Sequence, residues 1–294
     1  MCLKEARPSV LGIFLLRFLA GSALAIRTGG DGHPVETALG ALVWVSAIWS
    51  VYLFNGVMDV REDKINGSRR PIARGDLDPD VALVYVLCGA AVSLTGALLL
   101  RGPTIWLVAA VLALGYLYSG PPYYLKRGST GTAVVGGLAG LMSYLAGFTA
   151  ATGGEWSERG SAALPLFAAG ASLWMGLIGT ATKDLPDVAG DAASGRRTLA
   201  VRHGDFAVRV GASVTALTLA CTFIGLTVAA HLALMAPGLA MLAGAIAVAA
   251  LSLTPLSKGD RSHRRRPYRA FMVTQYALHI TALLPLVTHL VLSL

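Results

Sequence analysis

The strongest constraint on this chain is a series of nine mostly apolar stretches, each 16 to 25 residues long, within a total of 294 residues. A helix that crosses the hydrocarbon layer of a membrane needs about 20 such residues. The sequence therefore predicts an all-α membrane protein with nine transmembrane helices, forming a single domain over residues 1–294. The expected spans are residues 10–26, 35–54, 81–100, 104–119, 132–151, 162–182, 207–231, 232–253 and 270–292.

The composition agrees with this prediction. Hydrophobic residues make up 55% of the chain and charged residues only 14%, whereas soluble domains carry about 25% charged residues. This excludes a water-soluble globule, a disordered chain and a nucleic-acid-binding domain, despite a net charge of +8. We therefore expect the lipid bilayer, and no nucleic acid, as the partner of this chain.

Basic residues are distributed unequally between the two sets of span ends. Of the 24 Lys and Arg residues, 20 lie on the side that includes the N-terminus. The positive-inside rule makes that side cytoplasmic. We expect a multi-pass protein of a bacterial-type cell membrane, with its N-terminus in the cytoplasm and its C-terminus outside. The basic run at residues 262–269 is interpreted as an orientation anchor rather than a ligand site.

Two acidic clusters lie in corresponding loops on the predicted cytoplasmic side. The first follows the second span and the other follows the sixth, and in each the acids are succeeded by a glycine and paired arginines. Asp59 and Asp187 are 128 residues apart, with four spans between them. An even number of spans gives both units the same orientation, which indicates two parallel four-helix repeats plus a ninth helix. Each repeat would contribute half of one site, through the loops at about 55–76 and 183–204.

The spacing of these polar residues predicts a metal site. At 100° per residue, Asn55, Asp59 and Asp63 fall within about 80° on one helix face. The acids of the other cluster fall within about 60°, unless Pro186 distorts the turn. Like charges at such spacing repel, and hard oxygen ligands suit Mg²⁺. The expected metal ligands are Asn55, Asp59, Asp63, Asp184, Asp187 and Asp191. The alternative is that they are solvated loop charges paired with nearby arginines.

These residues resemble the motifs of the UbiA superfamily of intramembrane prenyltransferases. The family motif NDxxDxxxD appears as Asn55-Gly56-x-x-Asp59-x-x-x-Asp63, and the second motif, DxxDxxxD, is complete at residues 184–191. Residues 118–126 are similar to the family loop YSxPPxxLK. The resemblance covers nearly the whole chain, with one departure. Gly56 stands where the family commonly has an acid, so the first cluster has one carboxylate fewer.

The resemblance implies Mg²⁺-dependent transfer of a prenyl group from an allylic prenyl diphosphate to a lipophilic acceptor, most often an aromatic one in this family. Ionisation would give an allylic carbocation, which the acceptor attacks. The catalytic residues implied are Asp59, Asp63, Asp187, Asp191 and Lys126. The diphosphate-binding residues implied are Arg17, Arg70, Lys126, Lys183 and Tyr118. For Lys126 and Arg70, simple positive-inside anchoring is the alternative.

Two other functions stay open on the sequence. A membrane terpene cyclase of the same superfamily would use the same metal–diphosphate site without an acceptor, and nothing in the motifs separates it from a transferase. A transporter could use the intramembrane acids for an ion or substrate pathway. The acids lie at the ends of spans, however, and the repeat is parallel, so transport is the remoter alternative.

Overall fold

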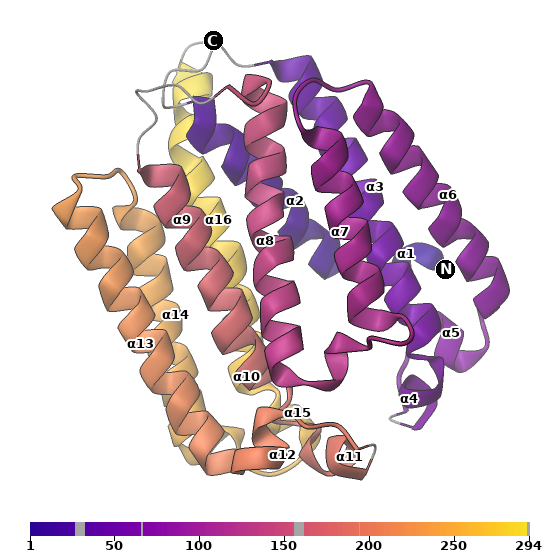
Figure 1. The fold of residues 1–294 in the computed structure, drawn as a ribbon. Helices are drawn as coiled ribbons and strands as arrows, with labels where there is room; N and C mark the ends of the chain where they lie inside the picture. Colours follow the sequence, from indigo (N-terminus) through magenta and orange to yellow (C-terminus); the bar gives the residue numbers. More distant parts are fainter. Residues whose placement is uncertain (27–32, 66, 156–161, 194, 293–294) are drawn as a thin grey trace. The chain divides into compact units, whose positions relative to one another are not determined.

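The computed structural model describes the chain except for residues 27–32, 66, 156–161, 194 and 293–294 (Figure 1). Within the described residues the chain forms helices and turns, with one isolated β-bridge between Gly128 and Arg197. The fold is therefore all-helical, as the sequence predicts. The chain divides into two compact units, one made of Met1–Lys126 with Leu141–Gly160 and the other of Arg127–Gly140 with Ser161–Leu294.

The first unit is built around one long helix, α3 (Pro34–Met58), which packs against α1, α2, α4, α6 and α7. Prolines begin several of its helices, because a proline at the first helical position loses no internal hydrogen bond. Asp78 caps α6 by accepting hydrogen bonds from the backbone N–H groups of Asp80 and Val81. The other helices are α1 (Cys2–Glu5), α2 (Pro8–Ile26), α4 (Val60–Ile65), α5 (Pro71–Arg74), α6 (Pro79–Leu98) and α7 (Thr104–Ser119).

Helix α8 (Ser129–Thr152) contributes its first half to the second unit and the rest to the first. In the first unit it meets α2 so closely that only glycine fits at the contact. A Cβ atom on Gly147 would overlap the backbone oxygen of Phe18, and a Cβ on Gly21 would overlap that of Tyr144. The hydroxyl of Ser22 also donates a hydrogen bond of 2.9 Å to the carbonyl oxygen of Gly147. Small residues and a polar contact thus hold α2 against α8, as is common between membrane helices.

The second unit contains a helix whose hydrogen-bond pattern changes midway. Helix α9 (Ala163–Leu173) continues through a π-helical turn, η2 (Trp174–Gly179), into α10 (Thr180–Lys183). Such π-turns occur frequently at functional sites. Helix α14 packs against α13 and α16, while α13 and α16 also contact η2. The remaining helices are α11 (Val188–Ala193), α12 (Leu199–His203), α13 (Asp205–Ala229), α14 (Met235–Leu253), α15 (Arg261–Arg264) and α16 (Arg266–Leu292).

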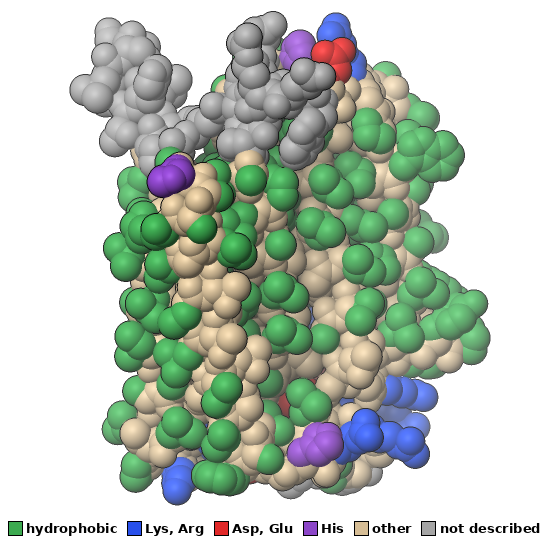
Figure 2. Space-filling model, turned by 60° about the vertical axis from the view of Figure 1, so that its left-hand side comes forward, with side chains coloured by type: hydrophobic (Ala, Val, Ile, Leu, Met, Phe, Trp, Pro, Cys, Tyr) green, Lys and Arg blue, Asp and Glu red, His purple; other side chains and the backbone are tan. Residues whose placement is uncertain are grey.

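The helices expose the surface that a bilayer requires. Most of each predicted range is helical in the described chain, although three ranges run two or three residues past the helix ends and the sixth falls on the continuous segment α9–η2–α10. Seven helices are long and apolar enough to cross a membrane. Helix α7 is apolar but has only 16 residues, and the side chains at the end of α16 lie outside the described residues. Hydrophobic side chains spread along the visible surface of the helices (Figure 2). The exposed hydrophobic residues include Leu42, Val214 and Leu226. The count of nine spans, the parallel repeat and the orientation remain predictions.

The close contact between α2 and α8 generates a test of this packing. We expect Gly147→Ala to lower the free energy of unfolding by about 1–3 kcal/mol, because the added methyl group forces the two backbones apart. Thermal unfolding of the purified protein in detergent measures the change. Gly211→Ala is the matched control, since a Cβ there has no atom within 4 Å. Equal melting temperatures for the two variants would contradict the packing described.

Candidate active site

Helical geometry continues through the first acidic cluster. Asp59 lies between α3 and α4 with helical backbone angles (φ −93°, ψ 0°). Its N–H donates to the carbonyl oxygen of Asn55 at 3.0 Å, and the N–H of Asp63 donates to that of Asp59 at 2.8 Å. These bonds maintain the four-residue hydrogen-bond pattern of an α-helix. Asn55, Asp59 and Asp63 therefore share one helix face, as their spacing predicts.

Two basic side chains bind the carboxylates of this cluster. The ammonium group of Lys126, on the short helix η1 (Leu125–Arg127), contacts Asp59 Oδ1 and is almost fully buried. Arg70 Nη1 lies 2.8 Å from Asp63 Oδ2 and 3.8 Å from Asp59 Oδ2. The structure thus brings together the two acids, Lys126 and Arg70, which are far apart in sequence.

The amide of Asn55 is oriented by the end of α7. Its Nδ2 donates a hydrogen bond of 2.9 Å to the hydroxyl of Ser119, which is buried. The amide nitrogen is therefore engaged within the protein, and the carbonyl oxygen is the atom that would bind a cation. The preceding residue, Tyr118, is half-buried at the same helix end, and its predicted role in diphosphate binding remains a prediction.

Glu5 is a member of this cluster that the sequence analysis missed. Its side chain is fully buried, and Oε1 forms an ion pair of 2.7 Å with Arg70 Nε. The backbone N–H of Ile72 donates to Oε2 at 2.9 Å, and Arg70 Nη2 donates to the carbonyl oxygen of Glu5 at 3.1 Å. Its only signal in the sequence is an isolated acid just before the first span, which gives no indication of a partner 65 residues away.

Basic side chains also line a pocket beside α1 and α5, with a volume of about 340 Å³. Because Arg70 contributes both to this pocket and to the acidic cluster, it links the carboxylates to a surface suited to anions. The pocket is lined by Met1, Lys4, Arg69, Arg70, Pro71, Arg74 and Asp76.

The second acidic cluster does not lie on one continuous helix. Helix α10 ends at Lys183, and Pro186 separates it from α11, because proline cannot continue the helical hydrogen bonds. The N–H of Asp187 donates to the carbonyl oxygen of Asp184 at 3.2 Å, and the N–H of Asp191 donates to that of Asp187 at 2.8 Å. Asp187 and Asp191 keep helical spacing, whereas the predicted single face for all three acids is interrupted at the proline.

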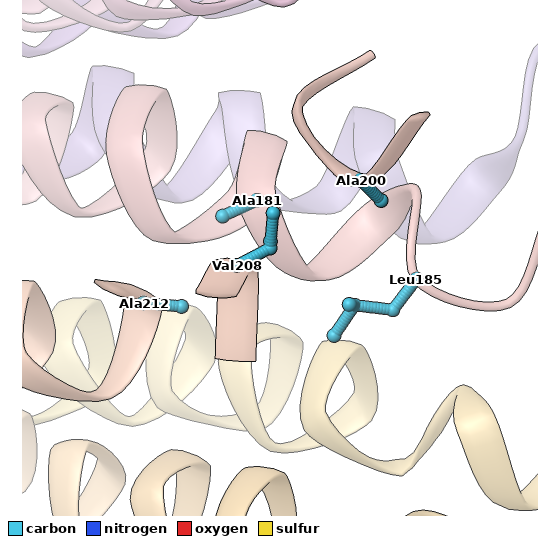
Figure 3. Close-up of a cluster of buried hydrophobic side chains, with 5 residues drawn as sticks. All are labelled: Ala181, Leu185, Ala200, Val208 and Ala212. Carbon is cyan, nitrogen blue, oxygen red and sulfur yellow. The ribbon is translucent and has the colours of Figure 1, made fainter. Parts of the chain in front are cut away.

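A small hydrophobic cluster anchors this loop within the second unit. Leu185, directly after Asp184, is fully buried and packs with side chains from the end of α10, from α12 and from α13 (Figure 3). The loop is also joined to the start of α8, where Ser129 accepts a hydrogen bond of 2.8 Å from the N–H of Leu199. The acids therefore extend from a packed support. The cluster consists of Ala181, Leu185, Ala200, Val208 and Ala212.

Each acid of the second cluster has a basic neighbour. Lys183 lies 3.4 Å from Asp184, and Arg196 lies 3.7 Å from Asp191. Arg261 Nε is 2.6 Å from Asp187, a contact that the sequence analysis did not anticipate. Arg265, in the basic run predicted to be an orientation anchor, lies 3.9 Å from Asp187. The second cluster, like the first, combines carboxylates with cationic side chains.

Burial raises the pKa of one of these acids. Desolvation raises the pKa of the Asp191 carboxyl to about 6, the neighbouring Asp184 carboxylate acts in the same direction, and Arg196 opposes both. Both Asp184 and Asp191 are more than nine-tenths buried. Two buried carboxylates in one loop are costly without compensating positive charge.

Arg17 lies in aromatic surroundings at the middle of α2. It is fully buried, its guanidinium carbon lies 5.1 Å from the centre of the Phe14 ring, and its guanidinium donates a hydrogen bond to Tyr144. A cation above an aromatic face is favourable. Its predicted role as a diphosphate ligand remains a prediction.

The donor set fits Mg²⁺ chemically. In the described part of the chain, no three His, Cys, Asp or Glu side chains converge as a complete metal site. Mg²⁺ in proteins, however, is commonly held by one or two carboxylates together with water and substrate phosphates. Carboxylates and one amide oxygen are the hard ligands that this ion prefers, so the predicted ligands match it.

The described residues form an all-helical fold with apolar helices of membrane-spanning length and two acidic clusters, which is the pattern of an intramembrane enzyme. Sequence comparison identifies the family. The chain belongs to the UbiA prenyltransferase family, whose model matches residues 14–276. It is 30% identical over 224 residues to digeranylgeranylglyceryl phosphate synthase of Methanopyrus kandleri, covering 74% of this chain and 75% of that protein. It is 31% identical over 156 residues to protoheme IX farnesyltransferase of Alcanivorax borkumensis, covering 51% of this chain. The match spans about half the length of that relative (50%).

Solved structures show the same fold. A UbiA homologue from Aeropyrum pernix K1 without ligand superposes with a TM-score of 0.72 at 18% identity, over 93% of this chain and 97% of that one. A homologue from Archaeoglobus fulgidus bound to DMAPP and Mg²⁺ gives a TM-score of 0.66 at 17% identity, over 95% and 98% of the two chains. At these identities the likeness concerns the fold alone.

The hydrophobic support of the second acidic loop can be tested. We expect Leu185→Ala to lower the free energy of unfolding by about 2–5 kcal/mol, because it leaves a cavity beneath the loop. Thermal unfolding in detergent measures this loss. Leu256→Ala, at a leucine that is 55% exposed, should leave the melting temperature nearly unchanged. A similar effect of both substitutions would show that Leu185 does not anchor the loop.

Proposed function

We propose that this chain is a Mg²⁺-dependent membrane prenyltransferase. It transfers a prenyl group from an allylic prenyl diphosphate to a lipophilic, aromatic acceptor. The observation that carries the proposal is the combination of carboxylates and buried cations in one group, with Asp59 and Asp63 held by Lys126 and Arg70. Carboxylates bind a divalent metal, and lysine and arginine bind phosphate oxygens.

Family membership and the names of two relatives support the prenyl-transfer part of this proposal. The relatives are a farnesyltransferase and a digeranylgeranylglyceryl phosphate synthase. Homologous structures contain DMAPP or GPP together with Mg²⁺. The clusters at the ends of apolar helices give the diphosphate a polar site and leave the apolar prenyl tail beside apolar side chains.

The proposed role of each residue follows from the charge of its side chain. Asn55, Asp59, Asp63, Asp184, Asp187 and Asp191 are assigned to the metal. Mg²⁺ supplies positive charge that neutralises the leaving diphosphate. Lys126, Arg70 and Lys183 bind diphosphate oxygens, with Arg17 and Tyr118 as further candidates. In the substrate-free protein, the ion pair between Lys126 and Asp59 holds both groups in place, and substrate binding transfers the ammonium group from the carboxylate to a phosphate oxygen.

The reaction then balances simply. The bond between the prenyl carbon and the diphosphate oxygen breaks, and the diphosphate leaves with the electron pair. The acceptor supplies the electrons of the new bond to the prenyl carbon and loses a proton. Apolar surroundings that exclude water protect the allylic cation from hydrolysis.

The acids provide the direct test of this proposal. We expect Asp59→Asn and Asp187→Asn each to reduce Mg²⁺-dependent prenyl transfer by about 100-fold or more, because each removes a charge that holds the metal and diphosphate. Mass spectrometry of products, across a panel of prenyl diphosphates and acceptors, measures the transfer. Asp80→Asn is the control, at an exposed acid in the first turn of α6.

Three results would overturn the proposal in different ways. Full activity in either Asp variant would refute the role of the two clusters. A cyclic hydrocarbon formed from the prenyl diphosphate without any acceptor would identify a terpene cyclase instead. Substrate uptake into proteoliposomes without diphosphate turnover would identify a transporter.

We also propose that the N-terminus is cytoplasmic and the C-terminus external, because 20 of 24 basic residues lie on one set of predicted span ends. Alkaline phosphatase fused after residue 294 should then be active, since this enzyme folds only outside the cytoplasm. The same reporter fused after residue 260 should be inactive. The reverse pattern would show the opposite orientation.

A further inference from the structure

Gly56 is the one position at which the first acidic motif departs from the family pattern, and the structure shows what occupies the space beside it. A Cβ atom built on Gly56 would overlap Glu5 Oε1. It would also lie 2.7 Å from Arg70 Nη2 and 2.9 Å from Glu5 Cγ. The space that an acidic side chain at position 56 would enter is therefore filled by the carboxylate of Glu5.

Glu5 reaches this space because α1 packs against α3 and α5. Its side chain is fully buried, and a buried carboxylate is costly unless it is paired. The compensation comes from Arg70 Nε at 2.7 Å and from the N–H of Ile72 at 2.9 Å. Both partners carry N–H groups, and each lies at a different oxygen of the Glu5 carboxylate, so a carboxylate makes use of both. Filling the space beside Gly56 would not by itself require an acidic side chain.

The charge of the cluster depends on Glu5. Lys126 and Arg70 contribute two positive charges, and Asp59 and Asp63 contribute two negative charges. Without Glu5 this group would be neutral, whereas with Glu5 it has a surplus of one negative charge. Arg70 also divides its contacts, with Nε on Glu5 and Nη1 on Asp63. Glu5 thereby holds part of the guanidinium charge away from the carboxylates that would bind a cation.

We propose that Glu5 supplies, from the N-terminal helix α1, the carboxylate that the first motif lacks at position 56. It is a positioning residue, since it acts through Arg70 on the Mg²⁺ affinity of Asp59 and Asp63. This inference rests on the proposed function. It also makes acids at positions 5 and 56 mutually exclusive, because their carboxylates would occupy the same space.

Relocating the carboxylate tests this inference in the purified full-length protein. The variants are Glu5→Gln, Glu5→Ala, Gly56→Asp, the double variant E5A/G56D and its matched control E5A/G56A. One readout is the Mg²⁺ concentration at half-maximal binding of geranyl diphosphate, measured by calorimetry. The other is the melting temperature without metal.

We expect Glu5→Gln and Glu5→Ala to raise the half-maximal Mg²⁺ concentration about 10-fold, because the cluster loses its surplus charge. Gly56→Asp alone should lower the melting temperature, since two carboxylates compete for one space. E5A/G56D should regain most of the Mg²⁺ affinity and have a higher melting temperature than Gly56→Asp. E5A/G56A should not regain the affinity, because it restores volume without charge.

The opposite results are distinct. Equal rescue by E5A/G56A and E5A/G56D would show that Glu5 only fills space. Unchanged Mg²⁺ dependence in Glu5→Gln, with a lower melting temperature alone, would make Glu5 purely structural. If Glu5→Ala does not fold, Glu5→Gln and the comparison of the two double variants decide the question.

Failure of the proposed function has its own signature. The unchanged protein would then bind no geranyl diphosphate at any Mg²⁺ concentration, which overturns the Mg²⁺ role of Glu5 as well. If E5A/G56D still had a higher melting temperature than Gly56→Asp, the overlap of the two carboxylates would be supported without a role in Mg²⁺ binding. Failure of this inference alone would leave the unchanged protein binding geranyl diphosphate normally.

Discussion

The structure depends on the pairing of charged side chains at the ends of long apolar helices. A buried carboxylate loses its hydration, and a nearby cation with good geometry must compensate for that loss. Arg70 does this for three carboxylates at once, those of Glu5, Asp59 and Asp63. In doing so it connects α1, the end of α3, α4 and the start of α5. The same interaction that stabilises this end of the unit therefore also assembles the proposed catalytic groups.

Close packing of the apolar helices supports these charges. In the first unit, α2 and α8 approach at Gly21 and Gly147 until their backbones nearly touch. In the second unit, Leu185 packs with its hydrophobic neighbours and anchors the acidic loop. The proposed transfer of a prenyl cation would require that catalytic groups stay in place and that water stays out. Close helix packing would serve the first requirement, and apolar surroundings would serve the second.

Much of the fold and part of the site could be predicted from sequence, because the relevant signals are local. Hydropathy located helices within a few residues, as with α7 at Thr104–Ser119. The four-residue spacing of Asn55, Asp59 and Asp63 placed them on one face, which the backbone hydrogen bonds confirm. The same argument failed for the second cluster, because Pro186 interrupts the helix and a proline cannot continue helical periodicity. The partners of these acids were harder to predict, because a charge pattern does not specify which cation lies nearest.

The sequence by itself determined a helical membrane protein of the UbiA prenyltransferase family, with its acids and amide in two recognisable motifs. Those features follow from composition and from spacings within one or two helical turns. Only the tertiary structure decided that Glu5 fills the space beside Gly56, and that Arg261 contacts Asp187 from 74 residues away. Such contacts depend on how helices pack, because side chains distant along the chain meet only once the apolar surfaces between them are buried. A missing acid in the motif is thus visible in the sequence, whereas the carboxylate that takes its place is visible only in the fold.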